Sequence, residues 1–219
     1  MNGKLIVIEG IDGSGKTTVW HNAKEKLQGE RRLWLHDPGD TRLGNCLRKI
    51  LLDPEMDKPF PMAREAELFL YLASRAQLVL ERILPALSEG LTVVLDRYWL
   101  STLAYQGVNL TIPKSSLREL VSIGTREAHW PSLMVWLDVS AETAEIRLRK
   151  RYEEQGIGLD RIESRGIDYL RRIRERYEEE LAIVESEKQS SVARISGEES
   201  VDSVTQAVVE AIRESENHI

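Results

Sequence analysis

Five short apolar runs alternate along the chain with longer stretches in which apolar residues recur at helical spacing. The strands that these runs predict are Leu5–Glu9, Arg32–His36, Leu91–Asp96, Leu133–Asp138 and Val192–Ser196. The middle runs are apolar nearly throughout, which is typical of buried strands in a parallel sheet. Glycine or proline precedes three of them, at Gly29, Gly90 and Pro131. The alternation predicts an α/β fold, with a five-stranded parallel sheet between layers of helices.

Two long helical patterns lie between these runs. The first covers about residues 62–88, where Pro85 is expected to end or kink the helix. Its predicted apolar stripe consists of Phe69, Ala73, Ala76, Leu80, Ile83 and Leu87. The second, about residues 162–188, is heavily charged and predicts a solvated helix with opposite charges three and four residues apart. Residues 152–160 are polar with two glycines and predict a mobile loop.

Composition restricts the class of protein. The 219 residues are 42% hydrophobic and 30% charged, and no linker divides them, so residues 1–219 are predicted to form a single domain. The net charge of −6 argues against a nucleic-acid partner. Cys46 is the only cysteine, and His21, His36 and His129 lack metal-ligand spacing, so no zinc site is expected. Because no apolar run suits a signal peptide or a membrane span, we expect a cytoplasmic protein without a membrane partner.

The most specific chemical signal is the stretch EGIDGSGKTT, which directly follows the first predicted strand. From Gly10 to Thr17 it has the spacing of a phosphate loop, which predicts the three-layer α/β/α P-loop NTPase fold. Its glycines let successive backbone N–H groups converge on phosphate oxygens, and the next helix adds its positive dipole end. Lys16 is predicted to reach the outer phosphates and Thr17 to ligate Mg²⁺. The predicted ATP-binding residues are Gly10, Ile11, Asp12, Gly13, Ser14, Gly15, Lys16, Thr17 and Thr18.

A second signal is the triplet Asp96-Arg97-Tyr98 at the end of the third predicted strand. In a parallel sheet the carboxyl ends of the strands form the ligand crevice, so the triplet should face the nucleotide. Asp96 is predicted to hold a metal-bound water beside Thr17, and Arg97 to bind phosphates as a planar fork. The alternative is a structural ion pair between Asp96 and Arg97.

A cationic cluster follows the fourth predicted strand, and Arg161 lies beyond it across the polar loop. The cluster consists of Arg147, Arg149, Lys150 and Arg151. Positioned arginines stabilise the charge that phosphoryl transfer spreads over the moving group. Arg147 and Arg151 are four residues apart and share a helix face, whereas Arg149 points elsewhere. For any single arginine here, a solvated basic surface is the alternative.

Taken together, these motifs resemble the thymidylate kinase family, whose members transfer the γ-phosphate of ATP to dTMP and so supply dTTP synthesis. The resemblance also rests on DPGDT at 37–41, SRAQ at 74–77, DRYWLSTLAYQG at 96–107 and LDRIES at 159–164. It implies a Mg²⁺-dependent nucleoside monophosphate kinase and a homodimer. It further implies a lid over residues 147–163 that closes on ATP.

The resemblance assigns roles to individual residues. The implied catalytic residues are Lys16, Arg97, Arg149, Arg151 and Arg161, the lid arginines supplying a cation that Gly13 and Ser14 lack. The implied acceptor-binding residues are Asp12, Tyr71, Arg75, Arg97, Ser101, Thr102, Tyr105 and Gln106. Tyr71 would stack on thymine, Arg75 would hydrogen-bond the base, and Tyr105 would disfavour a ribose 2′-hydroxyl. Tyr71 and Arg75 are four residues apart, so they are expected to share one helix face. The alternative is that Tyr71 packs into the core and that Arg75 pairs with an acidic residue.

Departures from the family pattern surround the acceptor side. His36 stands where arginine is usual, Asp37 replaces glutamate, Asp40 replaces glycine, and Leu100 replaces an acidic residue. These departures leave open a kinase for another deoxynucleoside monophosphate, either dUMP or a purine. A GTPase-type switch is a further alternative, although its guanine-reading Asn-Lys-x-Asp segment is absent. An arginine-rich RNA-binding segment over 147–176 is disfavoured by the interleaved acidic residues.

Overall fold

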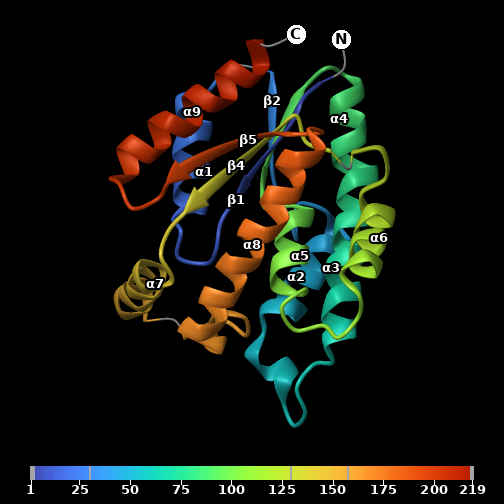
Figure 1. Ribbon diagram of the computed structural model, residues 1–219, viewed down its shortest axis with the longest axis vertical. Helices are drawn as coiled ribbons and strands as arrows, with labels where there is room; N and C mark the ends of the chain where they lie inside the picture. The colour runs from blue at the N-terminus through green and yellow to red at the C-terminus, as the bar shows by residue number, and fades with distance from the viewer. Residues whose placement is uncertain (1–2, 30, 129, 157, 218–219) are drawn as a thin grey trace.

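The computed structural model describes residues 3–29, 31–128, 130–156 and 158–217, so His129 lies outside the described residues. Its centre is a five-stranded sheet, all parallel, in the order β2-β3-β1-β4-β5 (Figure 1). The strands are β1 Leu5–Glu9, β2 Arg32–His36, β3 Thr92–Asp96, β4 Leu133–Asp138 and β5 Ser191–Ser196. This confirms the predicted α/β class and places every strand boundary within one residue of its expected position.

Helices cover both faces of the sheet (Figure 1). On one face, α1 (Lys16–Lys26) and α9 (Val201–Asn217) pack against each other and the sheet. On the other face lie α3 (Arg64–Leu78), α4 (Leu84–Ser88), α5 (Trp99–Tyr105) and α8 (Ile167–Glu187). The helices α2 (Arg42–Leu52) and α6 (Lys114–Thr125) flank α3, and α7 (Ala141–Gln155) follows β4 at the edge of the molecule. Short 3₁₀ turns occupy η1 (Pro54–Asp57), η3 (Arg126–Ala128) and η4 (Glu163–Arg165).

The central strand β1 explains where the phosphate loop is held. Its side chains alternate between two buried clusters, Leu5 and Val7 on one face of the sheet and Ile6 and Ile8 on the other. Full burial of each such side chain contributes on the order of 1.5–3 kcal/mol. A strand anchored on both faces presents its carboxyl end, and hence the loop after it, in a fixed position.

The long helix before β3 differs from the prediction in the face that it buries. Within the predicted apolar stripe, Phe69 and Leu80 are 56% and 51% exposed and Ala73 is exposed, so these three residues lie outside the core. The helix buries Leu68 and Leu78 instead. A π-helical stretch, η2 (Val79–Ile83), joins α3 to α4. Ile83, the last residue of this stretch and a member of the predicted stripe, lies in the core.

Pro85 does not end this helix, which continues to Ser88. It lies in the first turn of α4, directly after η2, and that is the part of a helix where a missing N–H is tolerated best. The second long helical pattern, which was predicted to be a solvated helix, also differs from its prediction. It forms α8, which begins at Ile167 and buries one face that includes Tyr169, Ile173 and Tyr177. It is solvated on its remaining faces only. At the predicted loop, α7 extends to Gln155.

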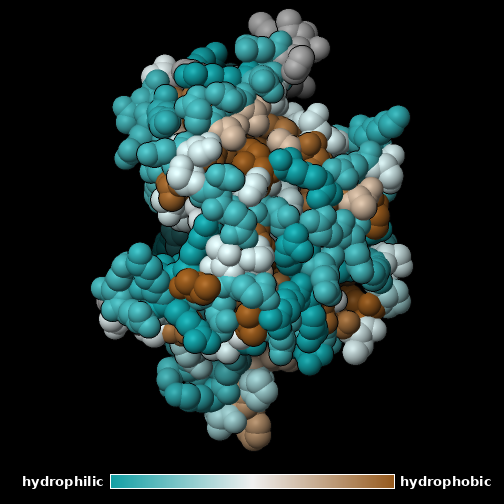
Figure 2. All heavy atoms as spheres, turned by 60° about the vertical axis from the view of Figure 1, so that its left-hand side comes forward, coloured by the Kyte–Doolittle hydropathy of each residue, from teal (hydrophilic) through white to brown (hydrophobic). Residues whose placement is uncertain are grey.

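The surface in Figure 2 is largely hydrophilic, and its hydrophobic residues form separate small groups. Among the described residues, no helix combines the length and the apolar character that crossing a membrane requires.

Candidate functional site

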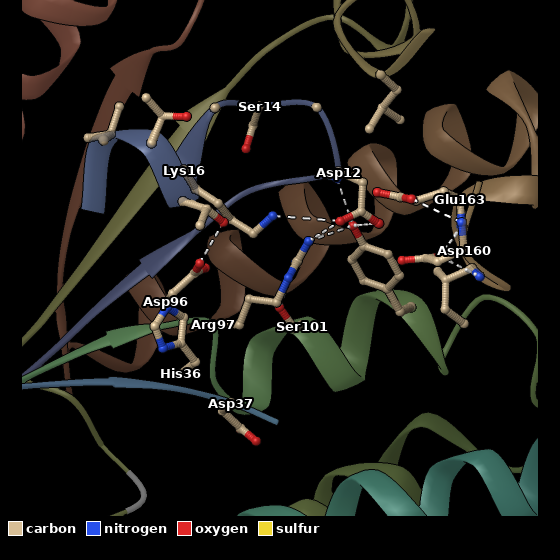
Figure 3. A pocket seen from close by; sticks show the side chains of 18 of the residues that line it. Asp12, Ser14, Lys16, His36, Asp37, Asp96, Arg97, Ser101, Asp160 and Glu163 are labelled. Atoms are coloured by element: carbon tan, nitrogen blue, oxygen red, sulfur yellow. Dashed lines mark hydrogen bonds and ion pairs between the residues drawn. The ribbon is translucent and has the colours of Figure 1, made fainter. Parts of the chain in front are cut away.

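The carboxyl ends of the strands open into a cavity of about 680 Å³ (Figure 3). The cavity collects the predicted loop residues from Asp12 to Thr18 and the predicted metal residue Asp96. It also collects every predicted acceptor residue, namely Asp12, Tyr71, Arg75, Arg97, Ser101, Thr102, Tyr105 and Gln106. Segments far apart in sequence therefore converge on one chamber, as the strand-end rule predicts.

Two glycines of the phosphate loop have backbones that disfavour side chains. Gly13 and Gly15 have φ of 80° and 84°, in the left-handed region. A Cβ atom on Gly13 would lie 2.3 Å from the carbonyl oxygen of Ala144, so the loop contacts the backbone of α7 directly. Gly15 is the N-cap of α1, which leaves the first N–H groups of that helix available to an anion.

Asp12 lies between two cations at the centre of the cavity (Figure 3). Its Oδ1 is 2.5 Å from Arg97 Nη2 and 3.6 Å from Lys16 Nζ, while Tyr105 donates its hydroxyl proton to Oδ2 at 2.9 Å. Burial would raise the pKa of Asp12, but the charges of Arg97 and Lys16 outweigh it and lower that pKa. An ionised Asp12 thus holds both cations in position.

Arg97 spans the cavity from the loop to the start of α5. Its backbone has φ of 69°, and its Nη1 donates to the carbonyl of Gly10 at 2.9 Å and to Ser101 Oγ at 3.0 Å. Its ion pair is with Asp12, so the alternative of a structural pair with Asp96 does not hold. Arg97 therefore lies between the phosphate loop and α5, the two segments predicted to bind the donor and the acceptor.

Thr17 and Asp96 meet as predicted for a metal site. Thr17 Oγ1 donates to Asp96 Oδ2 at 2.7 Å, and Asp96 Oδ1 is buried with no hydrogen-bond partner in the described chain. Oxygen ligands of this kind suit Mg²⁺, which keeps several waters and phosphate oxygens around it. The described residues contain no cluster of three or more metal-ligating side chains, so most ligands would come from water and phosphates.

The part of the cavity that is predicted to hold the nucleoside combines an aromatic ring with polar atoms that lack hydrogen-bond partners among the described residues. Tyr71 lines it, and Arg75 donates from Nε to Asp37 Oδ2 at 2.6 Å. The alternative of Arg75 paired with an acid is thus found, yet Arg75 also lines the cavity. Arg75 Nη1 and Thr102 Oγ1 are buried without partners among the described residues. Buried polar atoms of this kind are costly unless a ligand bonds to them.

The arginines of the predicted lid divide into two groups, those that line the cavity and those that do not. Arg147 and Arg151 both line the cavity, as their four-residue spacing predicts. Arg151 is 2.5 Å from Glu163, whereas the Arg147 side chain has no hydrogen bond or ion pair among the described residues. Arg149 is 72% exposed and pairs with Glu145. Arg161 is buried against Glu67, with Nη2 to Oε2 at 2.6 Å. Neither of these two lines the cavity, and their catalytic roles stay predictions.

Several cavity residues were missed by sequence reasoning. Arg48 of α2 donates to the carbonyl of Pro38 at 2.9 Å and makes no ion pair in the described chain. No sequence signal distinguishes it from other arginines. The segment after β5, represented by Gly197 and Glu199, also lines the cavity and could have been found from its position at a strand end. At the predicted positions, Gly10 and Ile11 support the loop without lining the cavity.

Of the four departures from the family pattern, some line the cavity and others do not. His36 and Asp37 line the cavity, and His36 Nδ1 is 3.1 Å from Asp40 Oδ2. Leu100 is buried in the hydrophobic core instead. The substitutions at 36 and 37 are therefore the ones that lie where a ligand would be bound.

Comparison with known proteins agrees with this geometry. A family model described as thymidylate kinase matches residues 8–208. The thymidylate kinase of Nostoc punctiforme is 36% identical over 215 residues, which covers 97% of each chain. That of Caldanaerobacter subterraneus subsp. tengcongensis is 38% identical over 216 residues, 98% of this chain and 97% of the relative. That of Prochlorococcus marinus is 40% identical over 181 residues, 79% of each.

Proposed function

We propose that this chain, which belongs to the thymidylate kinase family, transfers the γ-phosphate of ATP to dTMP to give ADP and dTDP. The observation that carries the proposal is the position of Arg97. It bonds to the carbonyl of Gly10 on one side and to Ser101 on the other, so it lies between a triphosphate cradle and a nucleoside pocket within one cavity.

On the donor side, the backbone N–H groups of the loop and Lys16 hold the triphosphate. On the acceptor side, Arg97 and Arg48 hold the phosphate of dTMP, which brings a phosphate oxygen in line with the γ-phosphorus. That oxygen forms the new bond to phosphorus as the bond to the β–γ bridging oxygen breaks, and ADP leaves with the electron pair. Fixing the two reactants supplies much of the catalysis in such transfers.

The donor is proposed to bind with Mg²⁺, held by Thr17 directly and by Asp96 through water. The unpartnered buried oxygen of Asp96 supports this assignment. When bound, the cation neutralises charge on the phosphates.

Arg147 is proposed as the lid residue that contacts the transferred group, with Arg151 beside it. Arg147 lines the cavity and makes no ion pair within 4.0 Å among the described residues, although, after the backbone hydrogen bond from Ser140, its charge helps to lower the pKa of the Glu198 carboxyl. Arg151 is engaged by Glu163 and would have to exchange that partner for phosphate. Closure of the lid excludes water that would otherwise hydrolyse ATP.

Base selection is proposed to rest on Tyr71, Arg75 and Thr102. The ring of Tyr71 would stack on thymine, while the unpaired Nη1 of Arg75 and hydroxyl of Thr102 would bond to the carbonyl and N–H groups on its edge. Tyr105 is tied to Asp12, which supports its role beside the sugar.

A coupled assay of ADP release with dTMP, dUMP, dCMP and dGMP tests this function. We expect dTMP to have the highest kcat/KM. Turnover of dGMP at the rate of dTMP or faster would reject the choice of acceptor, and ATP hydrolysis unchanged by any monophosphate would reject the kinase.

We also propose that the protein acts as a homodimer in the cytoplasm. Phe69, Ala73, Ala76 and Leu80 follow the heptad spacing of a helix–helix seam, yet three of the four are exposed. A second copy presenting the same face would cover them in a two-fold interface. A single cysteine and the use of ATP support the reducing, ATP-rich compartment.

A further inference from the structure

We infer that Tyr177 is a positioning residue whose hydroxyl holds the Arg97 guanidinium ready for the acceptor phosphate. The inference rests on the proposed function, because Arg97 is there the residue that binds that phosphate. No motif in the sequence marks Tyr177, which lies within the charged pattern of α8.

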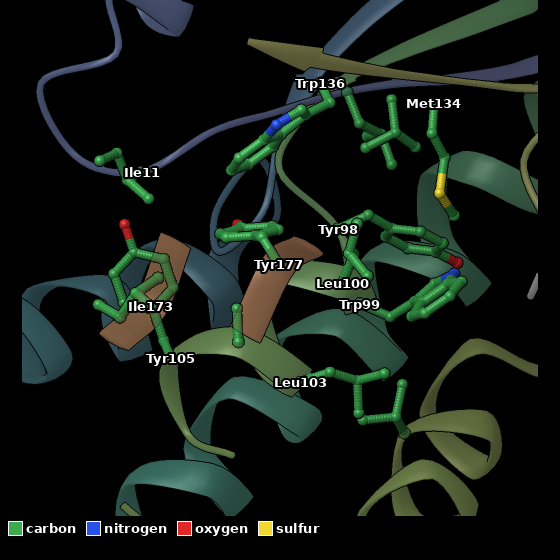
Figure 4. Close-up of a cluster of buried hydrophobic side chains, with 14 of the residues drawn as sticks. Ile11, Tyr98, Trp99, Leu100, Leu103, Tyr105, Met134, Trp136, Ile173 and Tyr177 are labelled. Atoms are coloured by element: carbon green, nitrogen blue, oxygen red, sulfur yellow. The ribbon is translucent and has the colours of Figure 1, made fainter. Parts of the chain in front are cut away.

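The ring of Tyr177 is held in the core (Figure 4). It is 0% exposed, and its centroid lies 4.4 Å from that of Trp136 and 6.3 Å from that of Tyr105. Packing on two aromatic rings leaves the hydroxyl little freedom of position. The hydroxyl lies 3.3 Å from Arg97 Nη1 and 2.6 Å from Ser101 Oγ.

A buried carboxyl group orients this hydroxyl. Tyr177 donates its proton to Glu9 Oε2 at 2.9 Å, and Glu9 is the last residue of β1. Glu9 also accepts from Ser101 Oγ at 2.6 Å and from the backbone N–H of Tyr98 at 2.9 Å. With its proton directed at Glu9, the Tyr177 oxygen presents its lone pairs to Arg97, and such linked bonds strengthen one another.

Both terminal nitrogens of the Arg97 guanidinium are consequently held by hydrogen bonds. Nη1 contacts Gly10, Ser101 and Tyr177, while Nη2 contacts Asp12 at 2.5 Å and the Tyr105 hydroxyl at 3.1 Å. Contacts at two nitrogens fix the plane of the guanidinium and not only the position of its charge. Arg97 Nε has no hydrogen-bond partner among the described residues.

Tyr177→Phe removes the hydroxyl and keeps the ring contacts. Titration calorimetry is then done with dTMP and with thymidine, which lacks the phosphate. We expect dTMP binding to weaken about tenfold, the usual scale for one hydrogen bond to a charged group, with thymidine binding unchanged. In steady-state assays the KM for dTMP should rise while the KM for ATP stays constant.

Tyr98→Phe is the matched control, because Tyr98 does not line the cavity, although the triplet to which it belongs was expected to face the nucleotide. Tyr98 is also buried, and its hydroxyl donates to the carbonyl of Ala128 at 2.9 Å. We expect it to leave the binding of both ligands unchanged. In an Arg97→Lys background, Tyr177→Phe should change dTMP affinity less than twofold, because the group that it positions is gone.

Equal weakening of dTMP and thymidine, or unchanged dTMP binding by a folded Tyr177→Phe protein, would overturn the inference. Should that variant fail to fold, Glu9→Gln decides by the same two titrations, since it disturbs the orienting carboxyl. If the wild type prefers another monophosphate, the proposed acceptor is wrong, and the comparison is made with that monophosphate and its nucleoside. If the wild type binds no monophosphate, both proposals fail.

Discussion

Arg75 and Asp37 form an ion pair inside the protein, with Nε 2.6 Å from Oδ2 and side chains only 1% and 0% exposed. Burial raises the pKa of Asp37, and the neighbouring Arg75 opposes this without cancelling it. Each partner keeps one buried atom without a hydrogen bond in the described chain, Nη1 of Arg75 and Oδ1 of Asp37. The pair is therefore maintained at a cost that binding of a base would reduce.

Arg75→Met should abolish measurable dTMP binding and destabilise the fold by about 3–5 kcal/mol, because Asp37 is left as an uncompensated buried charge. Urea unfolding and dTMP titration measure the two effects. Arg82→Met is the control, since Arg82 is half-buried and donates to the carbonyl of Asp40. It should cost about 1 kcal/mol. A loss in Arg75→Met no larger than in the control would contradict the assigned role.

Asp96→Asn should raise the Mg²⁺ concentration for half-maximal activity by at least about tenfold, the scale found for groups that support a metal through water. Initial rates are measured across a Mg²⁺ titration, and EDTA should abolish activity in the wild type. Asp168→Asn, at an 88% exposed side chain paired with Arg171, should have the wild-type midpoint. Equal midpoints for the Asp96 variant and the wild type would remove Asp96 from the metal site.

Arg147→Ala should lower kcat about a hundredfold with little change in the KM for dTMP, since it removes a cation that acts on the transferred group. Lys150→Ala is the control from the same helix, because Lys150 is 73% exposed and pairs with Glu154 at 3.8 Å. Stopped-flow or coupled assays suffice. A near-normal kcat in Arg147→Ala would redirect attention to Arg151, Arg149 and Arg161.

Phe69→Glu should convert the proposed dimer to a monomer at micromolar concentration, because it would place a charge without a partner in the apolar helix–helix contact. Light scattering after size exclusion gives the mass directly. Ile146→Glu replaces an apolar residue on α7 that is 67% exposed, against 56% for Phe69, and should keep the proposed dimer. A monomeric wild type, or a dimeric Phe69→Glu protein, would disprove the α3 interface.

Asp160 provides a pH test. Burial, and then the charge of Glu163, raise its pKa to about 6 from 3.8. Between these values the folded state binds more protons than the unfolded state, so this group's contribution to stability falls as pH rises through the window. Asp160→Asn cannot titrate, and its amide oxygen can still accept from Ile162 N and Glu163 N. Its urea midpoint, relative to wild type, should therefore rise between pH 4.5 and 7; a constant difference would contradict the raised pKa.

The strands and the phosphate loop could be predicted from sequence because their signals are local. Five apolar residues and a glycine-rich turn carry their own conformational preferences, so Leu5–Glu9 and its loop were placed correctly. The face of α3 could not be predicted, since apolar spacing identifies a helix but not what covers it. Phe69 and Leu80 satisfy the pattern and yet lie outside the core.

The site was predictable to the extent that motifs mark it. Arg97, Asp96 and Thr17 belong to recognisable segments and do meet in the cavity. Tertiary packing alone brings Arg48 to the cavity and Tyr177 into contact with Arg97, from helices whose sequences resemble any charged amphipathic helix. The partner of Arg75 likewise depends on which strand lies beside which.

The contact between Gly13 and Ala144 means that an arginine on the phosphate loop and an α7 packed against that loop exclude each other. A β-carbon at position 13 would lie 2.3 Å from the carbonyl oxygen of Ala144 in α7. An arginine could therefore replace Gly13 only if α7 moved away. Because the phosphate loop carries no arginine at this position, the proposed stabilising cation has to come from the predicted lid. Under the proposed mechanism, closure of the lid and delivery of the stabilising cation to ATP would therefore be a single event.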